Sequence, residues 1–164
     1  MSGPEYPRHY ERSALLACSP EAAFAHLDDF RKLSAHMEQR PGMMAGSSMT
    51  IETDEREGRA VGSTVRMRGT MLGMELALTE VVTEREPPRR KAWQTTDARL
   101  LVIGPYRLGF KLDPEVGRTR ARIFIDYALP ERMRWLGRLF GGIYARWCVD
   151  RMAADAARHF RRQT

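Results

Sequence analysis

The chain has few cysteines and no long apolar run, and each shortage excludes a class of protein. Two cysteines in 164 residues, Cys18 and Cys148, with no CxxC pair and no Cys/His ligand spacing, provide neither a disulfide framework nor a zinc motif. No stretch of about 18 uncharged apolar residues is present, which excludes a transmembrane helix. The opening MSGPEYPRHYERS lacks an apolar h-region, so we expect no secretory signal. These features predict a cytoplasmic protein with free thiols and with neither metal nor cofactor.

Linear catalytic signatures are missing as well. The sequence contains no GxSxG, no HExxH, no P-loop and no GxGxxG before a helix, and its four histidines are isolated. His26 with Asp29 or His36 forms a conceivable acid–base pair, but its helical position favours a surface or half-buried role. An enzyme that shapes a reactive chain with one Arg, Tyr or His leaves no motif. The sequence therefore leaves open whether a reaction is catalysed.

The chain is basic, with a net charge of +6 and a pI near 9.8, which raises the question of an anionic partner. Its 24 arginines and 3 lysines are scattered, with short clusters only at 89–91, 118–122 and 158–162. This distribution favours a solvated basic surface over a nucleic-acid site. We predict no nucleic-acid partner, and steeply salt-sensitive binding would be the sign of an exception.

The first part of the chain predicts a strand and two short helices. HYERSALLA (9–17) has the composition of a strand, and a helix then starts with Ser19 as N-cap, Pro20 at the first helical position and Glu21 in the first turn. A second short helix is predicted over DFRKLSAHM (29–37), before the glycine- and proline-containing loop RPGMMAGSS.

The middle of the chain changes to a period of two, which predicts six more strands. They cover residues 48–55, 62–71, 74–86, 90–98, 105–113 and 118–130. Short connections such as MLG and EPPR imply hairpins, and hence an antiparallel meander. Seven strands with one apolar face need a cover, and only the segment after Pro130 is long enough to provide it.

Residues 131–162 predict that cover as one long amphipathic helix with three glycines near its start. We expect Leu136, Phe140, Ile143 and Trp147 to face the sheet. Gly137, Gly141 and Gly142 lack side chains and would let strands or a ligand approach the helix backbone, at a cost of about 1 kcal/mol each relative to alanine.

This order of elements resembles the START-like or SRPBCC superfamily, which includes polyketide cyclase/dehydrase-like and birch-pollen-allergen-like proteins. The matching pieces are ACSPEAAFAHLDDF, REGRAVGSTVRMRG, MELALTEVVTEREPPRR and PYRLGFKLDPEVGRTRARIFIDYALP. KLSAHM stands where members often carry a tryptophan. The resemblance implies an α+β helix-grip fold, with a seven-stranded curved antiparallel sheet around the C-terminal helix and two short helices between strands 1 and 2. We predict a single domain, 1–164, with its core at about 9–160.

The resemblance also implies a cavity between sheet and helix for lipids, polyketides or hormone-like ligands. Seven methionines between positions 37 and 74 suit an adaptable apolar lining, although each one alone fits an ordinary core. Arg68, Glu75, Asp126 and His36 are candidates for orienting a ligand, but alternation does not say which strand face is inside. The predicted ligand-binding residues are Met67, Arg68, Met74, Trp93, Tyr106, Phe110, Tyr127, Leu136, Phe140, Ile143 and Trp147.

Three functions follow from these features, and the oligomeric state stays open. The leading prediction is binding, transport or sequestration of a small hydrophobic or amphipathic ligand. The alternative is a polyketide cyclase/dehydrase-like enzyme that uses general acid–base catalysis, with Arg68, Glu75 or His36 projecting into the cavity. A third is an interaction module whose basic helix end RHFRR (158–162) docks on an acidic protein, RNA or a membrane surface.

Overall fold

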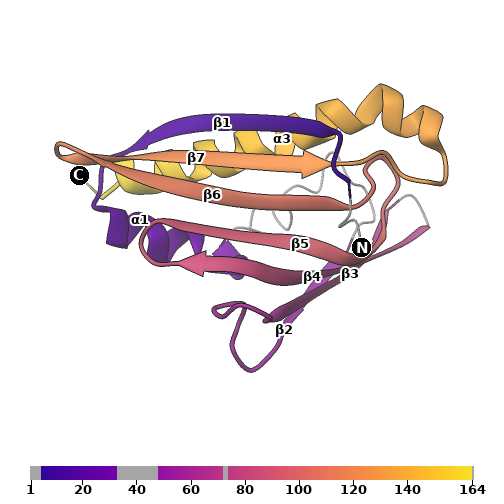
Figure 1. Cartoon of the computed structure of the whole chain (residues 1–164), viewed down its shortest axis with the longest axis horizontal. Helices are drawn as coiled ribbons and strands as arrows, with labels where there is room; N and C mark the ends of the chain where they lie inside the picture. The colour runs from indigo at the N-terminus through magenta and orange to yellow at the C-terminus, as the bar shows by residue number, and fades with distance from the viewer. Residues whose placement is uncertain (1–4, 33–47, 72–73, 164) are drawn as a thin grey trace.

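The computed structural model of the chain describes residues 5–32, 48–71 and 74–163. A curved antiparallel sheet of seven strands is followed by one long helix, so the predicted helix-grip architecture is confirmed (Figure 1). Residues 30–32 are helical, and the rest of the second predicted helix, which includes His36, lies outside the described residues. The elements are β1 (Arg8–Leu16), α1 (Pro20–Leu27), β2 (Ser48–Thr53), β3 (Thr64–Met71), β4 (Met74–Glu86), β5 (Arg90–Arg99), β6 (Tyr106–Glu115), β7 (Arg118–Tyr127) and α3 (Arg134–Arg161).

The strands pair in the order β1-β7-β6-β5-β4-β3-β2. Strands β2 to β7 form a meander, because each pairs antiparallel with the next one along the chain. The first strand adds to the far edge beside β7 (Figure 1). The β6–β7 hairpin turns at Gly117, whose φ of +72° is a conformation that favours glycine. The predicted antiparallel meander is therefore confirmed.

Burial identifies the face of each strand that points inward. In β7, Ile123 and Ile125 are buried and alternate with more exposed residues. In β3, Val65 is fully buried, and Met67 shares its face two residues on. Arg68 consequently lies on the opposite, outer face and is exposed.

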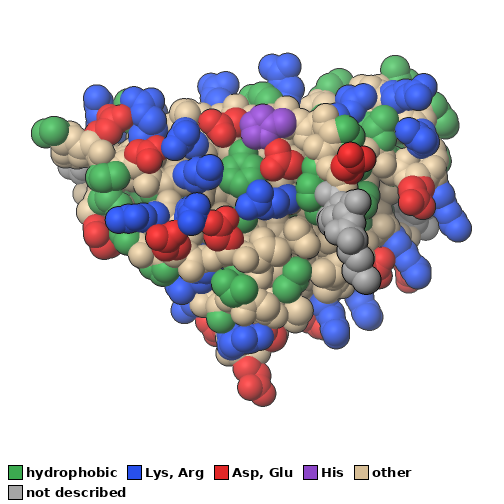
Figure 2. Space-filling model, viewed as in Figure 1, with side chains coloured by type: hydrophobic (Ala, Val, Ile, Leu, Met, Phe, Trp, Pro, Cys, Tyr) green, Lys and Arg blue, Asp and Glu red, His purple; other side chains and the backbone are tan. Residues whose placement is uncertain are grey.

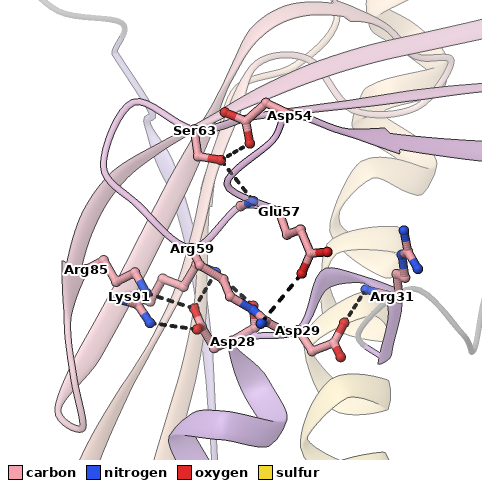
Figure 3. Close-up of polar contacts among 10 residues, drawn as sticks. Asp28, Asp29, Arg31, Asp54, Glu57, Arg59, Ser63, Arg85 and Lys91 are labelled. Carbon is pink, nitrogen blue, oxygen red and sulfur yellow. Dashed lines mark hydrogen bonds and ion pairs between the residues drawn. The ribbon is translucent and has the colours of Figure 1, made fainter.

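The end of α1 is tied to the sheet by a buried group of charges (Figure 3). The Asp28 carboxylate accepts two hydrogen bonds from the Arg85 guanidinium, at 3.1 and 2.9 Å, and one from Lys91 Nζ at 2.7 Å. Lys91 is buried and also lies 4.4 Å from the centre of the Phe30 ring. Burial alone would raise the pKa of Asp28, but the Arg85 and Lys91 hydrogen bonds outweigh it and lower that pKa.

Helix α3 packs against the sheet at β1 and β7, and it lies behind them in Figure 1. Its buried side is made of small residues in the first turns, Gly137, Gly141 and Ala145, and of larger ones such as Val149 and Met152 further on. A Cβ atom at Gly137 would lie 2.5 Å from the Pro130 ring, and one at Gly141 would lie 2.8 Å from the carbonyl oxygen of Val102. The glycines thus allow a close approach, as expected, although the groups that approach are a loop and a proline.

The predicted orientation of the first turns of α3 was wrong. Phe140 and Ile143, which were expected to face the sheet, are 47% and 65% exposed. Leu136 and Trp147 are half-buried. The physical reason is that only side chains as small as those of Gly137 and Gly141 fit against the loop, so the large residues turn away from it.

Candidate functional site

The inner face of the sheet is not fully covered around strands β3, β4 and β6. Met67, Leu78 and Leu108 all point to the buried side, as their pairing with inward-facing neighbours shows, yet each is only half-buried. Among the described elements, the main packing partners of α3 are β1, β7 and α1. Met67, Leu78 and Leu108 thus form a half-buried apolar surface on the inner face of the sheet.

One carboxyl group lies on this apolar side of β4. Glu80 shares its strand face with Leu78 and Val82, and its side chain is 2% exposed. Oε1 accepts a hydrogen bond from the Tyr106 hydroxyl, while Oε2 is buried and has no hydrogen-bond partner among the described residues. A buried polar atom without a partner is costly, so Oε2 is available to a further hydrogen-bonding group.

The surroundings of Glu80 keep its carboxyl close to its titration point at neutral pH. Burial raises its pKa from the usual 4.5 to about 7 and is the largest influence. The Tyr106 hydrogen bond, the nearby Trp93 indole N–H and the positive charge of Lys91 act in the opposite direction and are weaker. Both the protonated and the ionised form are therefore accessible near pH 7.

Helix α3 contributes two further polar groups opposite this carboxyl. Tyr144 and Cys148 are one helical turn apart, and both are half-buried. Interaction with Cys148 and burial raise the pKa of Tyr144, and burial raises the pKa of Cys148 to about 12. Burial and the charge of Glu80 likewise raise the pKa of Tyr106. These three groups stay neutral, and Glu80 is the one that changes charge near pH 7.

A carboxyl group with a pKa near 7 can act as either a hydrogen-bond donor or an acceptor at neutral pH. As a neutral acid, Glu80 can donate a hydrogen bond through its carboxyl proton to a carbonyl oxygen. As a carboxylate, it can accept one from a hydroxyl. The same change allows it to take up and return a proton.

The family model described as "Polyketide cyclase / dehydrase and lipid transport" matches residues 7–162, nearly the whole chain. The chain belongs to this family. The START-like/SRPBCC resemblance read from the sequence is thereby confirmed. No curated protein matches the chain.

Solved structures show how widely the fold of the polyketide cyclase/dehydrase and lipid transport family is shared. A point mutant of norcoclaurine synthase from Thalictrum flavum, in complex with a transition-state analogue, has a TM-score of 0.64 at 13% identity, with 95% of each chain covered. A Thermus thermophilus protein has a TM-score of 0.61 at 14% identity, over 90% of this chain and 91% of its own. A Rhodobacter sphaeroides protein reaches 24% identity with a TM-score of 0.57, over 92% of each chain. At these identities the likeness concerns the fold alone.

The structure brings four of the residues that sequence reasoning assigned to the ligand onto the inner face, where all are buried: Trp93, Tyr106, Phe110 and Tyr127. Met67 joins them as a half-buried residue. The prediction that Arg68 contacts the ligand is corrected, because this residue lies on the outer face. The side chain of Met74 lies outside the described residues, although its backbone belongs to β4.

The structure does not place the described residues that were predicted for acid–base chemistry on the inner face. Arg68 and Glu75 are exposed, and His36 lies outside the described residues. His26 is half-buried, as expected, and its ring stacks on His159 with the ring centres 4.1 Å apart. Burial and the neighbouring His159 lower the pKa of His26 to about 4, so the imidazole is neutral.

Sequence reasoning missed Glu80 and Cys148 as site residues. The sequence does contain a signal for Glu80. Alternate residues of this strand form one apolar face, and a carboxylate interrupts it: Leu76, Leu78, Glu80 and Val82. A charge in the apolar phase of a strand is unusual enough to mark a site. In the described part of the chain, no three His, Cys, Asp or Glu side chains are placed to hold a metal ion.

Proposed function

We propose that the chain binds a small, mostly apolar ligand that carries one hydroxyl or carbonyl group. Its apolar body lies on the half-buried inner surface of β3, β4 and β6, and its polar group contacts Glu80. The buried and unpartnered Oε2 atom of Glu80 carries this proposal. Membership of a family described by polyketide cyclases and lipid transport supports it.

The chemistry of the surface agrees with such a ligand. Half-buried Met67, Leu78 and Leu108 offer apolar area that a guest would remove from water. A single buried polar group then fixes orientation, which is the usual composition of small-molecule sites. Because Glu80 can donate or accept near pH 7, the site suits oxygen-bearing ring systems and sterol-like or lipid-like molecules with one polar end.

Native mass spectrometry of the purified protein tests the proposal, followed by solvent extraction and identification of the released compound. We expect wild type to carry a small apolar molecule with an oxygen group. Glu80→Leu removes the hydrogen-bonding group and should lose most of this molecule. Glu75→Leu on the exposed part of β4 is the matched control and should retain it. Retention by both variants would contradict the role of Glu80.

A second candidate function is supported by the same pKa, which lies where a general acid–base catalyst works best. In an intramolecular aldol reaction, the Glu80 carboxylate would remove the proton next to a ketone carbonyl. The resulting enolate carbon would bond to a second carbonyl carbon, and the proton would return to the alkoxide oxygen. No oxidant, reductant or metal is consumed. The family description, which names polyketide cyclases and dehydrases, makes this reaction worth testing.

Exchange of α-protons tests this second candidate without knowledge of the substrate. 2-Tetralone is incubated with the protein in heavy water, and deuterium uptake next to its carbonyl is followed by NMR. An enzyme should accelerate uptake, and Glu80→Gln should abolish the acceleration while Glu75→Gln keeps it. Uptake at the buffer rate would leave ligand binding as the function of the site.

A further inference from the structure

The first turns of α3 expose a continuous run of large apolar side chains. Met133, Trp135, Leu139, Phe140 and Ile143 are all exposed, Trp135 by 61% and Leu139 by 60%. In Figure 1 this orange part of the helix extends past the ends of β1 and β7. Isolated apolar residues are common on protein surfaces, but a contiguous group of this size marks an interaction site.

The orientation of this patch is fixed by the packing behind it. Gly137 and Gly141 allow the helix to lie directly against Pro130 and the carbonyl of Val102. A Cβ atom at either position would clash with these groups. A rotation of the helix that buried Leu139 would force larger side chains into this contact. The packing of the fold therefore determines that this apolar face is exposed.

The segment that carries the patch is rich in positive charge. Residues 131–146 contain four arginines, Arg132, Arg134, Arg138 and Arg146, and one carboxylate, Glu131. Within the described ranges, none of these four makes an ion pair, although Arg146 lies over the ring of Tyr10 at 5.4 Å.

The outer face of the sheet is different, since acidic and basic side chains interleave across it (Figure 2). There, Arg90 pairs with Glu84 and Glu86, and Arg122 pairs with Asp113. These basic side chains on the outer face have acidic partners in the same chain. The four arginines of the patch segment have no ion-pair partner among the described residues, so their charge is available to an external anionic partner.

We propose that this patch docks the protein on an anionic membrane surface. Trp135, Leu139 and Ile143 enter the boundary between headgroups and acyl chains, and the arginines contact the lipid phosphates. A second copy of the chain fits less well, because a two-fold pairing through the patch would set arginines against arginines. None of the described helices is long and apolar enough to span a bilayer.

This surface differs from the one considered in the sequence. The basic end at 158–162 was the predicted docking element, but Phe160 there is buried, His159 stacks on His26 and Arg158 pairs with Asp155. The patch lies at the opposite end of the same helix. It stands independently of the ligand at Glu80, although docking would let an apolar ligand pass between protein and lipid.

Co-sedimentation with large unilamellar vesicles tests the proposal, using phosphatidylcholine alone and a 7:3 mixture with phosphatidylglycerol at low salt. Wild type should bind the anionic vesicles at least about tenfold more tightly, since each arginine near such a surface contributes about fivefold. Trp135→Ser/Leu139→Ser/Ile143→Ser should lose more than tenfold. Val61→Ser/Val116→Ser removes exposed apolar residues elsewhere and should bind like wild type.

The charged part of the patch has its own matched variants. Arg132→Gln/Arg134→Gln/Arg138→Gln should abolish the preference for anionic vesicles, while Arg66→Gln/Arg68→Gln on β3 should keep most of it. Circular dichroism and thermal melting should be unchanged in all variants, because the altered side chains are exposed. Equal binding to both vesicle types would overturn the proposal. So would sedimentation of wild type as a dimer that the apolar variant dissociates, with no vesicle binding.

Discussion

Replacing Glu80 by glutamine should stabilise the protein at alkaline pH and leave it unchanged in acid. The reason is that the folded state keeps this carboxyl in an apolar environment that disfavours its charge. Glutamine has nearly the same shape, can accept the Tyr106 hydrogen bond through its amide oxygen, and carries no charge at any pH. The variant therefore isolates the cost of ionising Glu80.

The size of the effect follows from the pKa of Glu80, which rises from 4.5 when unfolded to about 7 when folded. A carboxyl with a raised pKa holds its proton more tightly in the folded state. Its contribution to stability is complete below pH 4.5 and is lost as the pH rises through 7. The shift corresponds to about 3 kcal/mol, most of which falls between pH 5 and pH 8.

Urea unfolding followed by tryptophan fluorescence measures this directly. The difference in unfolding free energy between Glu80→Gln and wild type is determined at pH 5 and at pH 8, so that all other titrating groups cancel. We expect this difference to increase by about 2–3 kcal/mol in favour of the variant. Glu75→Gln, which removes an exposed carboxylate of the same strand, should show no such increase. An equal difference at both pH values would refute a neutral buried carboxyl.

Five further substitutions test the packing of the fold. Asp28→Asn should cost about 3–5 kcal/mol in urea unfolding, because it leaves Lys91 charged and buried, whereas Lys91→Met should cost less since Asp28 keeps its arginine partner. His26→Leu should reduce the loss of stability between pH 6.5 and about pH 4, because the pKa of His26 is lowered on folding and its unfolded form gains a proton in that range. Gly141→Ala should lower stability by about 1–2 kcal/mol through contact with a backbone carbonyl. Gly142→Ala, with its nearest contact at 3.5 Å, should raise stability by up to about 1 kcal/mol.

The strands and helices could be predicted because local patterns determine them. Period-two alternation located β2 to β7 within a few residues, and Ser19 with Pro20 located the start of α1. Short connections then allowed only an antiparallel meander, and the remaining long helix had to cover it.

The orientation of α3 could not be predicted from its own pattern. Its first turns have two apolar faces, one of glycine and alanine and one of large side chains, and size alone favours burying the large one. The orientation of the helix is determined by Pro130 and Val102, which leave room only for glycine. Such a close contact between distant segments has no signature in local hydrophobicity.

The complete polar site could not be predicted from the sequence for a related reason. Glu80, Tyr106 and Tyr144 come from β4, β6 and α3, and their proximity depends on strand register and on the rotation of the helix. Alternation marks Glu80 as inward-facing, but the hydrogen-bond partner that leaves one oxygen unsatisfied becomes visible only in the folded chain.

The central claim is that Glu80 is the polar contact of an apolar ligand, and matched probes test it most directly. 1-Tetralol and 1-tetralone share one ring system, but the alcohol can donate a hydrogen bond and the ketone can only accept one. Isothermal titration calorimetry at pH 5.5 and pH 8.5 gives their affinities on each side of the Glu80 pKa of about 7. We predict that the preference for the alcohol grows at least about tenfold at the higher pH, and that this growth is absent in Glu80→Gln. A preference that is the same at both pH values in wild type, or no binding of either probe, would contradict the account.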